Sequence, residues 1–315
     1  MPLKEKLLIE RIRRAAAGGN RSLGAGIGDD CAVLALPRGH EALVTTDFSL
    51  ENVHFRREWH PPDSVGHRCL ARGLSDIAAM GGTPRAAFLS LALPAELPQK
   101  WVDQFVGGLL KLAKQYSVSL AGGDTAQSPD GILADIVVLG SAPAGKAILR
   151  SGAKPGDLLY VTGTLGSSSA TLNRLRDGEK LRPGSHPKHF YPAPRIAVGQ
   201  FLREKKLASA MIDISDGLST DLAHICDESR TGAVVYADAW PMADGIGDDS
   251  LQLALHGGEE YELLFTVRPD RRIPKQIAGV PITQIGEIIR GRQMKLAKAD
   301  RRTEILKPAG WEHFG

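Results

Sequence analysis

Apolar residues recur along this chain of 315 residues with the two periods that distinguish helices from strands. In the segment 3–17 they recur every three to four residues, which predicts an amphipathic helix ended by Gly18-Gly19-Asn20. Shorter apolar runs bounded by glycine, proline or aspartate are typical of strands. The other expected elements of the first half are strands Cys31–Leu36 and Ala42–Thr46, a helix from Asp63 or Ser64 to Met80, strand Arg85–Leu93, helix Pro98–Tyr116, and strands Val118–Ala121 and Ile132–Gly140.

After the first helix this order is β-β-α-β-α-β-β, an α+β pattern in which helices cover one sheet. Turn residues dominate around 144–155, so we place the boundary between two domains, 1–146 and 147–315, at this point. The second half predicts strands Asp157–Thr162, Ala208–Ile214, Ala233–Ala237, Tyr261–Val267, Ile282–Ile289 and Gln293–Ala297, a helix after Ser167, helices Pro194–Arg203 and Asp216–Glu228 (the latter capped by Ser215 or Asp216), and a loop over 178–193.

The composition is that of a folded protein with two domains. A chain of 315 residues, 43% of them apolar, exceeds what a single core usually covers. Its 39 Lys and Arg against 36 Asp and Glu leave a charge of +3 without a basic run, so we expect no nucleic-acid partner. A charged N-terminus and the lack of long apolar segments predict no signal peptide and no membrane span. Cys31, Cys69 and Cys226 are widely spaced, which indicates a reducing cytoplasm.

Aspartates that follow turns or apolar runs form the most distinctive polar pattern of the chain. They are Asp29 and Asp30 after the turn Gly26-Ile27-Gly28, Asp47 after Thr45-Thr46, and Asp76, Asp124, Asp213 and Asp216 in similar settings. Carboxylate and hydroxyl oxygens are the ligands that Mg²⁺ accepts. An isolated Asp-Asp pair is also typical of a solvated turn, but the recurrence indicates a metal–phosphate site built from several elements.

Two glycine-rich stretches resemble phosphate-binding turns. The segment from Gly140 to Ala147 almost fits G-x-x-x-x-G-K-[ST], but alanine replaces the hydroxyl residue and Pro143 removes a backbone N–H. We interpret this segment as a domain linker. The Gly163–Ser167 turn enters an expected helix, whose free N–H groups and dipole attract anions. Because such turns are common in α/β units, this turn alone does not identify a site.

Several short motifs follow one another along the chain. The first half carries Gly26-Ile27-Gly28-Asp29-Asp30-Cys31-Ala32-Val33, Thr45-Thr46-Asp47, Asn52-Val53-His54-Phe55, Leu74-Ser75-Asp76-Ile77-Ala78-Ala79-Met80-Gly81 and Gly122-Gly123-Asp124-Thr125. The second half carries Ser151-Gly152-Ala153-Lys154-Pro155-Gly156-Asp157, Asp213-Ile214-Ser215-Asp216-Gly217-Leu218, Gly257-Gly258-Glu259-Glu260-Tyr261-Glu262-Leu263-Leu264 and Gly310-Trp311-Glu312-His313-Phe314. In this order, and over essentially the whole chain, they resemble the thiamine-monophosphate kinases, a family of the aminoimidazole ribonucleotide synthetase-like superfamily.

This resemblance implies ATP-dependent phosphorylation of thiamine monophosphate, with ATP as co-substrate and several Mg²⁺ ions as cofactors. The residues that match the family's metal-coordinating positions are Asp30, Thr45, Thr46, Asp47, Asp76, Asp124, Asp213 and Asp216, of which Asp30, Asp47, Asp76, Asp124 and Asp213 are the expected catalytic residues. Those that match nucleotide contacts are Gly123, Asp124, Arg150 and Ser215, and those that match contacts to thiamine monophosphate are His54, Glu260 and Trp311. The resemblance also implies an α+β fold of two α/β domains, in a homodimer whose N-terminal sheets pair.

Two positions depart from the family pattern. Glu260 stands where the family usually has the aspartate of Gly-Gly-Glu-Asp-Tyr, so its carboxylate extends one methylene further. Gly73 stands where an asparagine usually precedes Leu-Ser-Asp, and the sequence offers no reason for this change.

The chemistry of the aspartates agrees with this resemblance. Phosphoryl transfer requires alignment of the reacting groups and neutralisation of charge on the phosphates, which metal ions held by carboxylates provide. The acceptor is itself a phosphate and is already nucleophilic at neutral pH. Because no nucleophile–base triad is recognisable either, we expect direct in-line transfer without a phosphoenzyme.

Several of these residues also have a purely structural interpretation. His54 could be a packing residue, Trp311 could dock the tail, and Arg150 could be a surface charge. Asp213 and Asp216 could be a strand end and a helix N-cap.

Two further classes of function remain open. One is a sister synthetase, of the aminoimidazole ribonucleotide or selenophosphate type, which would lack the Trp311 tail and the His54 motif. The other is a noncatalytic nucleotide-binding or maturation protein, whose hydrogenase-type version would need a reactive C-terminal cysteine. This chain ends instead in Glu312-His313-Phe314-Gly315.

Overall fold

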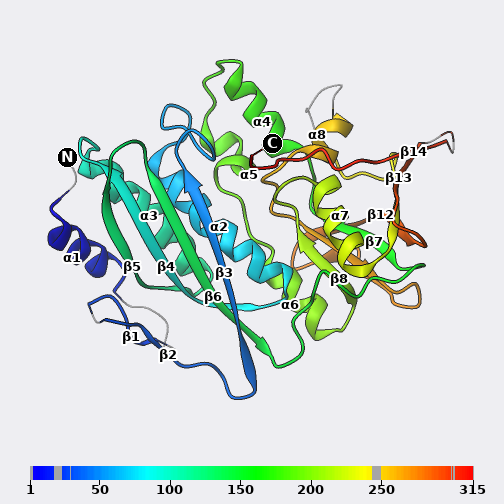
Figure 1. Ribbon diagram of the computed structural model, residues 1–315, viewed down its shortest axis with the longest axis horizontal. Coiled ribbons are helices and arrows are strands. Elements are labelled where there is room, and N and C mark those ends of the chain that lie inside the picture. Colours follow the sequence, from blue (N-terminus) through cyan, green and yellow to red (C-terminus); the bar gives the residue numbers. More distant parts are fainter. Residues whose placement is uncertain are drawn as a thin grey trace. The chain divides into compact units, whose positions relative to one another are not determined.

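The computed structural model describes residues 3–17, 23–28, 30–242, 250–298, 300 and 302–314 (Figure 1). The chain folds into two compact units. Unit 1 comprises Met1–Ile77, Gly82–Gly145 and Phe190–Pro192, and unit 2 comprises Ala78–Gly81, Lys146–His189 and Ala193–Gly315. Among the helices in the described ranges, none combines the length and the apolar character that crossing a membrane requires.

Unit 1 is built on a four-stranded sheet with the strand order β3-β6-β4-β5. Strands β4 and β5 are parallel and the other neighbours are antiparallel. The elements of this unit are α1 (Glu5–Ala15), β1 (Leu23–Ala25), β2 (Val33–Leu34), β3 (His40–Leu50), α2 (Pro62–Ala79), β4 (Thr83–Pro94), α3 (Gln99–Gln115), β5 (Ser119–Ser128) and β6 (Leu133–Pro143). Helices α2 and α3 cover one face of the sheet (Figure 1), which confirms the α+β pattern.

Helices α2 and α3 pack with their backbones in direct contact. A Cβ atom added at Gly66 of α2 would lie 1.9 Å from the carbonyl oxygen of Phe105. One added at Gly108 of α3 would lie 1.9 Å from the carbonyl oxygen of Asp63. Only glycine permits this approach at both positions. The two glycines therefore set the spacing of the helical layer that supports the sheet.

The apolar residues on the opposite face of β3 are uncovered. Successive side chains of a strand point to opposite faces. Leu43 and Ser49 point towards the helices and are buried, whereas Val44 and Phe48 point away and are 65% and 55% exposed. Strand β3 thus presents an apolar stripe, Val44 and Phe48, that no described residue of the chain buries.

Unit 2 contains a second sheet with the strand order β14-β13-β9-β12-β7-β10-β8, and β11 pairs with β12. Its strands are β7 (Leu158–Thr162), β8 (Ala208–Asp213), β9 (Gly232–Tyr236), β10 (Leu263–Val267), β11 (Gln276–Ile277), β12 (Val280–Ile289), β13 (Met294–Ala297) and β14 (Thr303–Ile305). Its helices are α4 (Ser167–Arg176), η1 (Pro183–Ser185), α5 (Pro187–Phe190), α6 (Ile196–Glu204), α7 (Leu218–Ser229) and α8 (Ser250–His256). A core that includes Ile212, Leu222 and Leu264 is fully buried between α7 and the sheet.

The structure corrects several expected boundaries. The strand expected over Val118–Ala121 continues to Ser128 as β5, because its pairing with β4 continues to Pro94. The strand expected over Cys31–Leu36 is only two residues long and pairs with β1, outside the main sheet. Residues 178–193, expected as a loop, contain the short helices η1 and α5. The expected end of the first helix at Gly18–Asn20 lies outside the described residues.

Candidate functional site

Thr45, Asp47 and Asp76 form the first group of expected site residues. Thr45 and Asp47 lie on the face of β3 that is turned towards α2. The Thr45 hydroxyl donates a hydrogen bond to Oδ2 of Asp76, which α2 carries. Asp76 is half-buried rather than sealed in the core. The strand and the helix thus bring hydroxyl and carboxylate oxygens together, which is a donor set that suits Mg²⁺.

Thr46 lies on the other face of β3. Its hydroxyl donates to Oδ1 of Asp135 on β6, with a distance of 2.8 Å between the oxygens. Because successive side chains alternate, the Thr45 and Thr46 hydroxyls cannot reach the same ion. Asp135 was not expected as a site residue, since it stands inside an apolar run without a neighbouring glycine.

A second group lies at the β5 edge of the sheet. A Cβ atom at Gly26 would lie 3.3 Å from the carbonyl oxygen of Ala121, so the loop that leads to the exposed Asp30 runs beside β5. A Cβ atom at Gly123 would lie 1.8 Å from the carbonyl oxygen of Leu89, so glycine is required where β5 approaches β4. Asp124 follows and is exposed, and one of its carboxylate oxygens accepts the Thr125 N–H at 2.8 Å.

The two groups of unit 1 are separated by the width of the sheet. Three strand spacings of about 4.8 Å place β5 roughly 14 Å from β3. In the parts of the chain that the structure describes, no three His, Cys, Asp or Glu side chains converge as a metal site. Whether Asp30, Asp47, Asp76 and Asp124 bind metal ions therefore stays a prediction.

Gly73 has a structural explanation that the sequence did not offer. It lies in α2 against β6, where an added Cβ atom would lie 2.5 Å from Cγ2 of the buried Val138. A larger residue at this position would force Val138 or the helix to move. In this chain, the absence of a side chain keeps α2, and with it Asp76, close to the sheet.

His54 follows β3 in a tight turn and is half-buried. Its Nδ1 accepts the backbone N–H of Leu50 at 3.0 Å, so the neutral ring carries its proton on Nε2. Arg68 of α2 donates to the carbonyl oxygen of His54 at 3.3 Å. These contacts hold the residue in place, and its contact to thiamine monophosphate stays a prediction.

In unit 2, the loop from Asp213 to Gly217 connects β8 to α7. The N-cap position of α7 is Gly217, without a side-chain cap, so the expected capping by Ser215 or Asp216 is wrong. Instead, Oδ2 of Asp221 in α7 accepts the N–H groups of Ser215, Asp216 and Gly217 at 3.1, 3.3 and 3.1 Å. Burial, and then the negative charge of Asp216, raises the pKa of Asp221 to about 7. Sequence analysis missed this aspartate because it lies within an expected helix.

The Glu259–Tyr261 segment lies next to this loop and has an unusual backbone. Glu259 and Tyr261 have φ angles of 61° and 51°, in the left-handed region that favours glycine. Such conformations cost on the order of 1–3 kcal/mol each and persist where the surroundings impose them. Between the two, the Glu260 side chain is turned inwards and is only 4% exposed.

The carboxylate of Glu260 lies at the N-terminus of α4. Its Oε1 accepts the N–H groups of Gly166 and Ser168 at 3.0 and 3.1 Å. The glycine turn Gly163–Ser167 is therefore an anion site, as its sequence indicates, but its anion is a carboxylate of the same chain. Burial raises the pKa of Glu260 to about 7, although the positive charge of Lys188 lowers it.

A second glutamate, Glu262, forms a buried cluster of charges beside Glu260. Its carboxylate accepts Nη2 and Nε of Arg195 at 2.5 and 2.6 Å, Nζ of Lys188 at 3.1 Å and the Thr162 hydroxyl at 2.6 Å. Glu262 is fully buried, so breaking one of these partnerships would leave an unpaired charge in the core. The cluster ties the strand after Glu260 to the segment before α6.

The C-terminal tail contacts the same loop. The backbone N–H of Trp311 donates to the carbonyl oxygen of Asp216 at 2.9 Å, while the residue as a whole is 49% exposed. Unit 2 therefore brings Asp216, Glu260 and Trp311 onto adjoining segments.

Arg150 precedes β7 with an exposed side chain, and its carbonyl oxygen accepts the Ser229 hydroxyl at 3.0 Å. Its predicted nucleotide contact stays a prediction.

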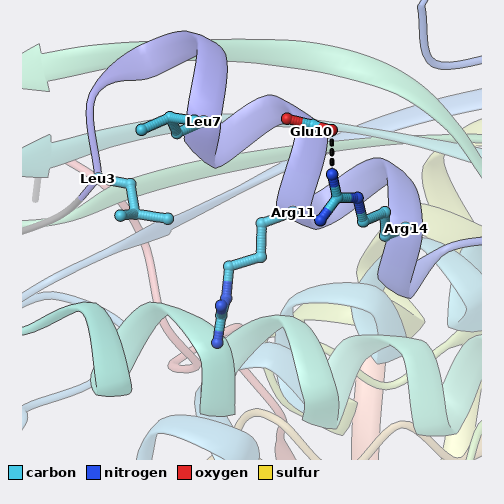
Figure 2. Close-up of a pocket in the computed structure, with 5 residues that line it drawn as sticks. All are labelled: Leu3, Leu7, Glu10, Arg11 and Arg14. Atoms are coloured by element: carbon cyan, nitrogen blue, oxygen red, sulfur yellow. Dashed lines mark hydrogen bonds and ion pairs between the residues drawn. The ribbon is translucent and has the colours of Figure 1, made fainter.

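A shallow hollow on α1 has no part in these groups. It is lined by Leu3, Leu7, Glu10, Arg11 and Arg14 (Figure 2). Figure 2 shows Arg11 reaching from α1 towards α3, where Asp103 accepts its Nε and Nη2 at 2.6 and 2.7 Å. Arg14 pairs with Glu10 on the same helix. Of these two ion pairs, the one between Arg11 and Asp103 joins α1 to α3.

Comparison with known proteins defines the class of this fold. The family model of the AIR synthase related protein, N-terminal domain, matches residues 28–142, and that of the C-terminal domain matches residues 154–298. The chain is thus a two-domain protein of the AIR synthase related type, with the expected pair of α/β domains.

Relatives within that class are more specific. The thiamine-monophosphate kinase of Salmonella typhimurium is 41% identical, over 100% of this chain and 99% of the relative. A crystal structure of thiamine-monophosphate kinase from Stenotrophomonas maltophilia K279a has a TM-score of 0.83 at 34% identity, over 94% of this chain and 97% of that one. The structure described as AaThiL complexed with AMPPCP and TMP has a TM-score of 0.79 at 30% identity, over 100% of this chain and 99% of that one. This chain belongs to the thiamine-monophosphate kinase family.

Proposed function

We propose that this chain transfers the γ-phosphoryl group of ATP to thiamine monophosphate and so forms thiamine diphosphate and ADP, the final step of thiamine diphosphate biosynthesis. The observation that carries this proposal is the likeness to AaThiL, a protein complexed with AMPPCP and TMP, over the full length of this chain. Among the residues expected to contact these two ligands, Glu260 and Trp311 lie on segments that adjoin the loop of Ser215 in unit 2.

The proposed cofactor is Mg²⁺, bound as several ions. Thr45 and Asp76 are hydrogen-bonded, and Asp47 lies on the same face of β3 as Thr45. All three side chains offer oxygen donors, the donor type that Mg²⁺ selects. When bound, such ions would neutralise charge on the phosphate oxygens. Asp30 and Asp124 would supply carboxylates at the β5 edge, and Asp213 and Asp216 would do so in unit 2.

The chain's other residues would bind and orient the two substrates. Gly123, Arg150 and Ser215 are the proposed nucleotide contacts, and Gly123 offers an uncovered backbone because it has no side chain. His54, Glu260 and Trp311 are the proposed contacts to thiamine monophosphate. Because the acceptor phosphate is already ionised, these residues need to align it rather than remove a proton, which favours direct in-line transfer.

We further propose a cytoplasmic homodimer. The apolar stripe of Val44 and Phe48 is exposed on the outer face of the unit 1 sheet, where a second copy of the same sheet would bury it. Cys31, Cys69 and Cys226 are all unpaired, which supports a reducing compartment.

An assay with radiolabelled ATP, thiamine monophosphate and Mg²⁺ tests the proposed reaction. We expect thiamine diphosphate and ADP in equal amounts, with the γ-phosphoryl label in the product, and no product after chelation with EDTA. Asp76→Asn keeps the shape but removes a charge from the proposed metal site, so it should abolish turnover. Asp63→Asn on the same helix is the matched control and should remain active. Formation of aminoimidazole ribonucleotide from its precursor, without thiamine diphosphate, would assign the chain to the sister synthetases.

A further inference from the structure

The loop between β8 and α7 is held from one side by a single carboxylate. The N–H groups of Ser215, Asp216 and Gly217 converge on Oδ2 of Asp221, which is 1% exposed. Three consecutive N–H groups on one acceptor fix the backbone of this loop more tightly than a helix N-cap, which satisfies one or two such groups.

The other side of the loop holds two segments that are distant in sequence. The carbonyl oxygens of Ile214 and Ser215 accept the N–H groups of Tyr261 and Glu259 at 2.9 and 2.7 Å. The carbonyl oxygen of Asp216 accepts the N–H of Trp311 at 2.9 Å. The inward N–H groups and the outward carbonyl groups belong to the same peptide units, so the orientation that Asp221 imposes also orients the carbonyls.

Both distant segments approach the loop through a glycine. A Cβ atom at Gly258 would lie 2.7 Å from the carbonyl oxygen of Ser215, and one at Gly310 would lie 2.2 Å from that of Asp216. The contacts are therefore between backbones, and they leave no room for adjustment by side chains. A change in the loop would move the Glu259–Tyr261 segment and the tail directly.

We propose that Asp221 is a positioning residue, which holds the Ser215–Gly217 loop so that its carbonyl groups seat Glu260 and Trp311. This proposal rests on the proposed function insofar as these two residues are the expected contacts to thiamine monophosphate. The Asp221 carboxylate accepts hydrogen bonds from the loop and is only 1% exposed, so we expect it to contact neither substrate. What Asp221 supplies is a side-chain oxygen that accepts hydrogen bonds. Asparagine keeps such an oxygen and should hold the loop in part, whereas alanine has none and should not hold it.

Amide hydrogen exchange tests the positioning independently of activity. In Asp221→Ala we expect faster exchange at the amides of Ser215, Asp216 and Gly217, and also at those of Glu259, Tyr261 and Trp311. In Asp221→Asn we expect rates between those of Asp221→Ala and the wild type. The matched control is Asp157→Ala, because Asp157 is also buried and accepts the Lys154 N–H at 3.0 Å and the Ser209 hydroxyl at 2.6 Å in a separate turn. Unchanged exchange at Glu259, Tyr261 and Trp311 in Asp221→Ala would overturn the proposal.

Steady-state kinetics of the same variants tests what the positioning does. We expect Asp221→Ala to raise KM for thiamine monophosphate by about tenfold or more, because small misplacements of contact groups are costly, with partial rescue in Asp221→Asn. Asp157→Ala should lower the melting temperature by a similar amount. It should nevertheless leave KM for thiamine monophosphate within about twofold of the wild-type value. An equal rise in both alanine variants would mean that Asp221 is merely structural. A wild-type chain that phosphorylates nothing would refute the proposed function, while the exchange rates would still decide the positioning.

Discussion

The indole ring of Trp311 is half exposed, whereas the backbone around it is fixed. The N–H groups of Ala309 and Gly310 donate to the hydroxyls of Ser219 and Thr220 at 3.2 and 3.1 Å, in addition to the bond from Trp311 to Asp216. The tail is thus docked by its main chain and does not need the ring as an anchor. The ring itself meets the His313 ring edge-on, with 5.7 Å between ring centroids.

We therefore predict that Trp311→Ala acts on substrate binding and little on stability. The thiazolium ring of thiamine monophosphate is a cation, and a cation over an indole gains roughly 0.5–2 kcal/mol. KM for thiamine monophosphate should rise about threefold to thirtyfold, and KM for ATP should change little. Trp311→Phe should recover part of the loss. Equal changes of both KM values with a lowered melting temperature would show that the ring docks the tail instead.

A second prediction at the residue scale concerns the proton of Glu260. Burial raises its pKa from 4.5 to about 7 in the folded chain. The unfolded chain loses this proton at lower pH, so Glu260 favours the folded state below about pH 4.5 and this contribution is lost as the pH rises to about 7. Glutamine has no proton to lose at this position.

Denaturant titrations of the wild type and Glu260→Gln at several pH values measure this effect. Between about pH 5 and pH 8, we expect the wild type to lose more of its free energy of unfolding than the variant does, by a difference on the order of 2–3 kcal/mol. Parallel pH curves for the two proteins would refute the raised pKa. Comparison of the two proteins cancels the contribution of Asp221, which both retain.

At the scale of elements, the spacing of α2 and α3 depends on two glycines, and α3 offers its own control. A Cβ atom at Gly108 would overlap the backbone of Asp63, whereas Gly107 is exposed and an added Cβ atom there meets nothing within 4 Å. Both glycines lie inside the same helix, where alanine is intrinsically preferred over glycine by about 1 kcal/mol.

We predict that the two alanine substitutions change stability in opposite directions. Gly107→Ala should stabilise the chain by roughly 0.5–1 kcal/mol. Gly108→Ala should destabilise it by roughly 1–3 kcal/mol, because separating the helices costs more than helix propensity returns. Equilibrium unfolding in urea measures both. A stabilising Gly108→Ala would show that the helices can separate without cost.

At the scale of the whole molecule, the exposed stripe of β3 predicts the state of assembly. Phe48→Glu places a charge in the proposed dimer interface and should convert dimers to monomers in sedimentation or light-scattering measurements. Ile305→Glu is the matched control and should leave the dimer intact. Ile305 on β14 is an exposed apolar residue like Phe48, with 61% exposure, but it belongs to unit 2. A wild-type chain that is monomeric at micromolar concentration would refute the dimer.

The class of the protein and most of its helices and strands follow from local patterns in the sequence. Apolar periodicity predicted α2, α3 and α6 within two or three residues, since their buried faces repeat with the helical period and glycine or proline lies close to their ends. The order of motifs predicted the family, because glycines and aspartates at fixed spacings recur over nearly the whole chain. Short elements such as β1, β11 and α8 were missed, since two to seven residues carry too little periodicity.

The tertiary structure alone decided which polar groups meet. The carboxylate of Glu260 lies at the N-terminus of α4, 94 positions from Gly166 along the chain, and no local pattern predicts that pairing. Asp221 lies inside an expected helix without any local mark of a role, yet its carboxylate accepts the N–H groups of the loop before that helix. The absence of a side chain at Gly73 is likewise explained by a distant contact. Gly73 lies on a helix and packs against Val138, on a strand more than sixty residues away. Local patterns arise from the chain's own periodicity, whereas these partnerships arise only when separate elements pack.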